Sequence, residues 1–154
     1  MHLLHVILLG GVCGCLGGYA MTYFMRAVSA AFSKRVDMIR ALGSYFDGNL
    51  EKAYRRGMVI HSLSGIFFGI VYFLIFDAMG ALVFPYAPFL GIGFGFFHGL
   101  FMSYMLMFYA CEKHPVEEYR DATLEEGLLH LVGHIIFGGV VGLLGGLAAL
   151  AFGA

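Results

Sequence analysis

Four long stretches without a charged side chain dominate this sequence of 154 residues. No Asp, Glu, Lys or Arg occurs in residues 3–25, 57–76, 78–111 and 127–154. A helix needs about 20 apolar residues to cross the hydrocarbon core of a bilayer, and each stretch is long enough. The pattern therefore predicts an all-α integral membrane protein of four transmembrane helices, which are residues 3–25, 57–79, 87–110 and 127–151.

The composition agrees with a membrane protein. Hydrophobic residues make up 60% of the chain and charged residues 12%, whereas a soluble domain is about 45–50% apolar and about 25% charged. The net charge of −1 provides no basic excess for binding nucleic acid, so we expect no nucleic-acid partner. The lipid bilayer is the first predicted partner.

All nine Lys and Arg residues lie in two connections, 26–56 and 111–126. By the positive-inside rule, both connections are predicted to be cytoplasmic, and both termini to lie outside, in a cytoplasmic (inner) membrane. The first connection mixes apolar and basic residues over 27–54. We expect this segment to be amphipathic and to lie on the anionic lipid surface, with a docking site for a protein as the alternative.

An internal repeat relates the two halves of the predicted single domain, 1–154. The first and third helices share the pattern L-G-x3-G-x3-G-x2-M-[ST]-Y, and the second and fourth share H-x3-G-x3-G. The halves, 1–79 and 86–154, are therefore predicted to be duplicated helical hairpins arranged as parallel repeats. Glycines four residues apart allow helices to pack closely. The predicted packing glycines are Gly10, Gly14, Gly18, Gly65, Gly69, Gly91, Gly95, Gly99, Gly138 and Gly142.

Four histidines fall within the predicted helices, where an ionisable side chain is costly and suggests a function. They are His61, His98, His130 and His134. His61 and His134 occupy equivalent positions in the two halves, so a pseudo-twofold axis places them at similar depth. Two facing imidazoles are typical ligands of a b-type haem. This interpretation makes His61 and His134 the candidate haem-binding residues.

The last helix carries a second candidate pattern. Glu126, His130 and His134 are spaced by four residues, so their side chains share one helix face. With His61 nearby, they predict a site for zinc, copper or iron. The alternative to both cofactors is that these histidines only donate hydrogen bonds between helices.

The segment HIIFGGVVG, residues 134–142, matches the pattern His-x2-[YF]-G-x3-G at His134, Phe137, Gly138 and Gly142. In this helix, in its glycine-rich first helix and in its length, the chain resembles small uncharacterised prokaryotic membrane-protein families of four helices. The resemblance implies a type of fold and no activity.

Several functional classes lack their motifs. The sequence has no Walker loop, no nucleophile elbow and no H-E-x-x-H motif. The leading hypothesis is therefore a non-catalytic accessory or structural subunit of a larger membrane complex, or a homo-oligomer. One alternative is an electron-transfer protein that binds b-type haem or a metal through His61 and His134. A further alternative is a small oligomeric channel or transporter.

Overall fold

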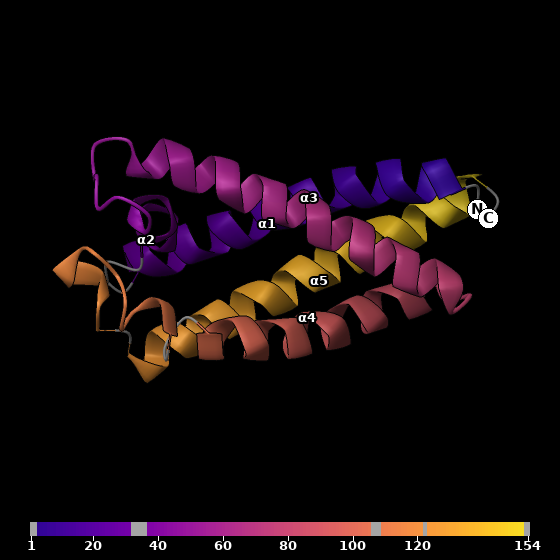
Figure 1. The fold of residues 1–154 in the computed structure, drawn as a ribbon. Helices are drawn as coiled ribbons and strands as arrows, with labels where there is room; N and C mark the ends of the chain where they lie inside the picture. The colour runs from indigo at the N-terminus through magenta and orange to yellow at the C-terminus, as the bar shows by residue number, and fades with distance from the viewer. Residues whose placement is uncertain (1–2, 32–36, 106–108, 122, 153–154) are drawn as a thin grey trace.

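A computed structural model describes residues 3–31, 37–105, 109–121 and 123–152 (Figure 1). The described residues form helices and connections without any strand. The elements in chain order are α1 (Leu3–Ala31), α2 (Met38–Ser44), α3 (Ala53–Ala78), α4 (Tyr86–Met105), the 3-10 helix η2 (Glu117–Tyr119) and α5 (Leu124–Phe152). Both termini lie at one end of the bundle, and α2 lies at the opposite end (Figure 1).

Among the described residues, three helices are long and apolar enough to cross a membrane by length and composition: α1, α3 and residues Leu124–Ala151 of α5. These helices overlap three of the spans predicted from the charge-free stretches. The fourth helix, α4, has 20 residues and no charged side chain, but its tyrosines, Pro88 and His98 lower its mean hydropathy. The all-helical fold is thus confirmed, together with three apolar helices of membrane-spanning length.

Glycines hold each pair of helices together. A methyl group added at Gly14 of α1 would come within 2.1 Å of the carbonyl oxygen of Gly65 in α3. Likewise, a methyl group at Gly138 of α5 would come within 2.0 Å of the carbonyl oxygen of Gly91 in α4. Because such distances leave no room for a side chain, α1 packs on α3, and α4 packs on α5, through their backbones.

One predicted packing glycine differs from the others. A methyl group at Gly18 would meet its nearest neighbour, Nε2 of His61, at an ordinary contact distance of 3.8 Å. At each of the other nine predicted positions the added methyl group would come within 3.0 Å of a neighbouring atom. Gly18 therefore lies where the α1–α3 interface widens.

The two hairpins pack alike but in different registers. The sequence repeat pairs Gly14 with Gly95, and it pairs Gly65 and Gly69 with Gly138 and Gly142. If the two hairpins had the same register, Gly95 would contact Gly138 and Gly142 as Gly14 contacts Gly65 and Gly69. Instead, a methyl group at Gly91 would lie within 2.1 Å of the Gly138 carbonyl oxygen and 3.1 Å of the Gly142 Cα. The register of α5 on α4 is thus displaced by one helical turn from that of α3 on α1. Whether the halves are duplicated stays a prediction.

The two hairpins meet mainly through α1 and α5. At this interface, a methyl group at Gly17 of α1 would lie 3.0 Å from the side chains of Phe137 and Val141 of α5. In the half of the bundle nearer the termini, the largest fully buried side chains are Val6, Phe73, Phe76 and Val141.

The first connection differs from the predicted amphipathic segment 27–54. α1 continues to Ala31, because Arg26 and the following residues include no helix breaker. α2 covers only seven residues, starting after Asp37, whose carboxylate accepts a hydrogen bond of 3.0 Å from the Arg40 amide. Residues 32–36 of the predicted amphipathic surface lie outside the described residues.

Two glycines allow α2 to pack closely against α3. Gly43 of α2 and Gly57 of α3 each lie against the backbone of the other helix, with no space for a methyl group. α2 therefore packs directly on α3, which orders this end of the bundle.

A capping interaction defines the start of α5: the Thr123 amide donates to Glu126 Oε2 at 2.7 Å, and the Glu126 amide donates to Thr123 Oγ1 at 3.2 Å. This reciprocal pair is a capping box.

Candidate functional site: a histidine-lined cavity

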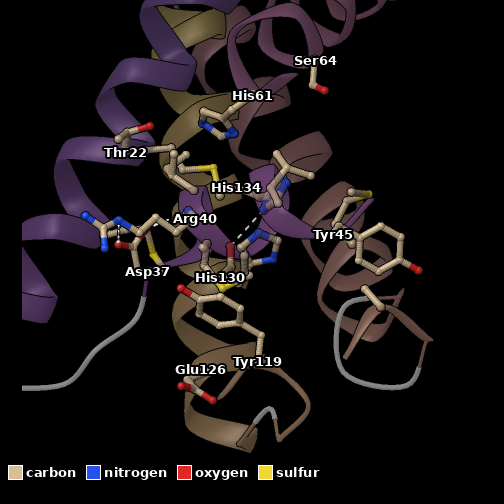
Figure 2. Close-up of a pocket in the computed structure, with 18 of the residues that line it drawn as sticks. Thr22, Asp37, Arg40, Tyr45, His61, Ser64, Tyr119, Glu126, His130 and His134 are labelled. Carbon is tan, nitrogen blue, oxygen red and sulfur yellow. Dashed lines mark hydrogen bonds and ion pairs between the residues drawn. The ribbon is translucent and has the colours of Figure 1, made fainter. Parts of the chain in front are cut away.

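A cavity of about 1160 Å³ occupies the half of the bundle nearer α2 (Figure 2). Its lining includes side chains from α1, α2, α3, α4 and α5 and from the segment before α5. The walls run from exposed residues such as Arg40 and Asp121 to Gly65 and Phe137 near the middle of the bundle. The cavity therefore reaches the surface at the α2 end of the bundle and extends to its middle.

The structure brings all four predicted metal-ligand residues to this one cavity. His61, Glu126, His130 and His134 line it, and so does His98 of α4. Figure 2 shows Glu126, Tyr119, His130, His134 and His61 in succession along the cavity. Depth and spacing along the chain were sufficient to group these residues.

His61 is held by α1. Its Nε2 lies 3.2 Å from the carbonyl oxygen of Gly18, and a carbonyl oxygen can only accept, so Nε2 carries the proton. The wide spacing at Gly18 leaves room for this ring between α1 and α3. His61 therefore makes the interhelical hydrogen bond that the alternative without a cofactor predicts.

Three imidazoles form a row on the other hairpin. The ring centroid of His134 lies 4.7 Å from that of His98 and 4.5 Å from that of His130, and both pairs are edge to face. Nδ1 of His134 donates to the carbonyl oxygen of His130 at 3.0 Å. Nε2 is then the nitrogen of His134 that carries a lone pair.

The inner end of the row is polar but incompletely paired. Nδ1 of His98 lies 3.2 Å from the hydroxyl of Tyr72, which is only 3% exposed. Nε2 of His98 and Nδ1 of His130 are buried and have no hydrogen-bond partner among the residues that the structure describes. Buried polar atoms are normally paired in native proteins. These two nitrogens are therefore positions where a bound molecule or a water would form a hydrogen bond with the protein.

The positions of the histidines affect the predicted metal site and the predicted haem site differently. Within the part of the chain that the structure describes, no three His, Cys, Asp or Glu side chains are placed to hold one metal ion. His98, His130 and His134 contact one another edge to face instead of pointing at a common centre. A haem requires only one or two protein ligands, and the pair of His61 and His134 stays a prediction.

Charged side chains surround the open end of the cavity. The carboxylates in its lining are Asp37, Glu118, Asp121 and Glu126, and the guanidinium groups are Arg26 and Arg40. Arg40 pairs with Asp37, with Nε and Oδ2 3.4 Å apart. Arg26 donates to the hydroxyl of Tyr54 at 2.8 Å. Burial raises the pKa of the Cys111 thiol at this end, and the nearby carboxylates of Glu126 and Asp121 raise it further.

His114 joins the two long connections across the cavity mouth. Its Nε2 donates to the carbonyl oxygen of Ala41 in α2 at 2.9 Å, and its Nδ1 accepts from the Val116 amide at 3.1 Å. The Arg120 Nε donates to the His114 carbonyl oxygen at 2.9 Å. His114 is 4% exposed, so this polar contact is an internal part of the fold rather than a surface feature.

Sequence reasoning did not assign roles to several residues of the cavity. It placed His98 in the membrane but gave it no partner, because the repeat supplies no equivalent histidine. No motif in the sequence indicates a role for Tyr72 or for the methionines. The methionines that line the cavity are Met21, Met25, Met38, Met102 and Met105. The i, i+4 spacing of Met21 and Met25 was the available signal of a shared helix face.

Comparisons with known proteins found no match to this chain among family models, curated proteins or solved structures. The resemblance drawn from residues 134–142 therefore stays a prediction. The geometry and chemistry of the cavity are the basis for the function proposed next.

Proposed function

We propose that this chain is a four-span integral membrane protein that binds a small solute in the histidine-lined cavity and exchanges it across the membrane. The observation that carries the proposal is a large cavity that is lined by all five α-helices and reaches from the α2 end of the bundle to its middle. Pockets of about 300–1,000 Å³ with a mostly apolar lining and a few polar groups are typical of small-molecule sites. The cavity of about 1160 Å³ is slightly larger than this range and has the same kind of lining, with a few buried imidazole nitrogens among apolar side chains.

The proposal includes α4 as the fourth span. Its 20 residues carry no charge and pack along α5 through Gly91, Gly95 and Gly99. Its outward side chains are large and apolar: Phe89 and Phe97 are each 71% exposed. Such side chains are stable in lipid and costly in water. With four spans, the positive-inside rule puts the cavity mouth on the cytoplasmic side.

A transporter fits the cavity better than a channel does. The buried core around Phe73, Phe76 and Val141 interrupts any continuous path, which a channel would need. The hairpins α1–α3 and α4–α5 are each tightly packed and meet mainly through α1 and α5. Two compact units joined by one main interface can rock against each other, which is a common way to expose a site to alternate sides.

The proposal is tested by the accessibility of a single cysteine. Ser64 lines the cavity, so Ser64→Cys, in a chain whose three native cysteines are replaced by serine, is reacted in intact cells and inverted vesicles with a membrane-impermeant maleimide. We expect fast labelling from the cytoplasmic side and slower labelling from outside. Labelling from one side alone would exclude exchange, and labelling from neither side would exclude an open cavity.

The neighbouring residue supplies a matched control. Leu63 is 62% exposed and does not line the cavity, so Leu63→Cys is expected to face lipid. Thiols react as thiolates, which need water. Leu63→Cys should therefore resist the maleimide from both sides, and the difference between adjacent positions then reports the cavity rather than general looseness.

The accessory-subunit hypothesis is a second candidate, and the outer face of α4 favours it. Phe89, Phe97 and Phe101 are more than half exposed on this face, and aromatic side chains are enriched where protein partners bind. Purification from native membranes in a mild detergent, followed by mass spectrometry, tests it. A larger protein present in stoichiometric amount, and lost from a Phe97→Ala/Phe101→Ala variant, would support this candidate.

A further inference from the structure

We propose that the solute of this cavity is an uncharged alcohol or phenol, a mainly apolar molecule whose hydroxyl group binds between His98 and His134. The inference rests on the proposed solute-binding function and names the class of solute. Three observations carry it: an unpaired donor on His98, an acceptor on the neighbouring ring of His134, and the distance of both rings from the charged side chains in the described lining.

The contact with Tyr72 determines which nitrogen of His98 carries the proton. The Tyr72 hydroxyl lies 3.2 Å from Nδ1 of His98. Because Tyr72 is only 3% exposed, its O–H group must donate within the protein, and Nδ1 is the acceptor in reach. Charging an imidazole among apolar side chains is costly, so the ring is neutral and has one N–H, on Nε2. Nε2 is buried and has no partner among the described residues, so it is an unpaired donor.

The neighbouring ring offers the complementary group. Nδ1 of His134 donates to the carbonyl oxygen of His130 at 3.0 Å, so Nε2 of the neutral His134 ring is an acceptor. The centroids of the His98 and His134 rings are 4.7 Å apart, and both residues line the cavity. A donor and an acceptor therefore lie on adjacent rings of the cavity wall.

A hydroxyl group can bond to both nitrogens at once. Its oxygen accepts from Nε2–H of His98, and its proton goes to Nε2 of His134. A carboxylate or a ketone can only accept, and an ammonium group can only donate. Nε2 of His98 is covered by neighbouring side chains in this structure, so binding includes a local side-chain movement, which is common when a partner binds.

The charged side chains of the described lining are distant from these rings along the helices. In α5, Glu126 lies eight positions before His134, and in α1, Arg26 lies eight positions beyond Gly18, whose carbonyl oxygen binds His61. Eight positions of a helix span about 12 Å. α4, which carries His98, has no charged residue. An ion between the rings would lose its hydration without a nearby opposite charge in the described lining, and an uncharged solute avoids this cost.

Apolar side chains surround the two rings. The ring centroids of Phe68 and Phe137 lie 4.1 Å and 6.3 Å from that of His98, and Met21 and Met102 also line the cavity. Apolar walls favour a solute that removes apolar surface from water. Together with the volume of about 1160 Å³, they fit a hydroxyl group on a bulky organic body better than a small alcohol.

A series of molecules with the same biphenyl body tests the hydroxyl group. Binding is measured by equilibrium dialysis against the purified full-length protein in a neutral detergent, with empty micelles subtracted. The series comprises para-phenylphenol, biphenyl, para-methoxybiphenyl, biphenyl carboxylate and biphenylmethylammonium. At neutral pH a phenol is uncharged, because its pKa is about 10. We expect saturable binding of para-phenylphenol at one site per chain and about tenfold weaker binding of the other four.

Each comparison in the series can overturn one part of the inference. Equally tight binding of biphenyl would show that the hydroxyl makes no contribution. Equally tight binding of para-methoxybiphenyl, whose oxygen accepts but cannot donate, would remove the bond to His134. Equally tight binding of the carboxylate or of the ammonium compound would show that the site does not select an uncharged solute.

The donor is tested by His98→Phe, which keeps an aromatic ring and removes both nitrogens. The preference for para-phenylphenol over biphenyl should fall from about tenfold to less than about threefold, while biphenyl still binds. The matched control is His61→Phe, because Nε2 of this cavity histidine already donates to the Gly18 carbonyl oxygen. His61→Phe should keep the full preference, and an equal loss in both variants would overturn the role of His98.

Tyr72→Phe gives a second measurement that leaves His98 in place. Without the Tyr72 hydroxyl, the proton of His98 can move to Nδ1, so the preference for para-phenylphenol should fall to an intermediate value. An unchanged preference would overturn the assignment of the proton to Nε2. This variant decides the question if His98→Phe loses the binding of biphenyl as well.

Absence of saturable para-phenylphenol binding would also overturn the inference. It would not decide the proposed function, because the labelling of Ser64→Cys requires no ligand. Two-sided labelling without this binding would leave an exchanging cavity with a different solute. Binding without two-sided labelling would leave a protein that binds an alcohol or phenol but does not transport it.

Discussion

The imidazoles of His98 and His134 lie edge to face with their centroids 4.7 Å apart, although one is on α4 and the other on α5. The contact exists because α4 and α5 approach through glycines: a methyl group added at Gly99 would lie 2.7 Å from the Cβ of His134. Because the two backbones lie so close together, the two rings pack directly against each other. The row of rings is thus a consequence of helix packing, and it forms the wall of the cavity.

The hydrogen bond between Tyr72 and His98 gives the first prediction. Tyr72→Phe removes the hydroxyl that lies 3.2 Å from Nδ1 of His98 and leaves a second buried nitrogen of that ring unpaired. We expect a loss of about 1–2 kcal/mol of stability, measured by unfolding in mixed micelles of detergent and SDS.

A double-mutant cycle separates this bond from simple packing. His98→Phe keeps an aromatic ring against Phe68, whose centroid lies 4.1 Å from that of His98, and removes both nitrogens. In that background Tyr72→Phe should cost less than about 0.5 kcal/mol, because no partner remains. Additive losses in the double variant would show that the two residues act independently.

The second prediction concerns the glycines of α1. Gly14→Ala places a methyl group 2.1 Å from the Gly65 carbonyl oxygen, where only backbone could yield. We expect separation of the α1–α3 pair and a loss of about 3 kcal/mol or more in the same unfolding assay. Gly18→Ala is the matched control, because the nearest atom lies at 3.8 Å and alanine has the higher helix propensity. Gly18→Ala should leave stability unchanged or slightly raised, and similar losses at both sites would contradict the interface described here.

The third prediction concerns the cofactors inferred from the sequence. We expect the purified protein to show neither a Soret band nor stoichiometric metal. The ring of His134 contacts the rings of His98 and His130 edge to face, and among the described residues no three potential ligands surround one point. His61 already uses Nε2 in a hydrogen bond to the Gly18 carbonyl oxygen. Absorption spectra before and after reduction, with elemental analysis, provide the measurement. A Soret band that disappears in both His61→Ala and His134→Ala would establish the haem pair instead.

Much of the helical architecture could be predicted from the positions of charges. Each charge-free stretch lies largely within one helix, although α1 continues past Arg26 to Ala31 and α3 begins at Ala53, before Arg55 and Arg56. The capping box that the structure shows at Thr123 and Glu126 could also be predicted, because it depends on residues three positions apart. These features follow from local chemistry and from the cost of placing charges in lipid.

The contacts inside the cavity could not be predicted in the same way. Depth along a helix says how far a residue lies from the membrane surface, but a side-chain contact also depends on rotation and register. The displacement of α5 by one turn relative to α4 sets which residues meet His134, and the sequence repeat favours a different pairing. His98 therefore had no predicted partner, although its depth near the middle of α4 was clear. The position of α2 depended likewise on the contact between Gly43 and Gly57 across separate helices.

The last prediction concerns pH and the connection that precedes α3. The guanidinium of Arg56 binds the carboxylate of Asp47, and this hydrogen bond, more than any other contact, holds the pKa of Asp47 below its ordinary value of 3.8. A lowered pKa in the folded state means that the pair stabilises the connection at neutral pH. That contribution is lost as the pH falls from about 4 through the lower pKa of the folded protein. Because Asp47 is exposed, we expect the effect to be small and to weaken with added salt.

Hydrogen exchange of the amides in residues 44–56 measures this effect locally. The wild-type protein should exchange faster, after correction for the intrinsic rate, as the pH is lowered from 5 to 3. Asp47→Asn should exchange faster already at pH 5 and show little further change. Glu51→Gln is the control, because it removes a carboxylate from the same connection without touching the pair, and it should retain the wild-type response. An unchanged pH response in Asp47→Asn would assign the acid sensitivity of this connection to another group.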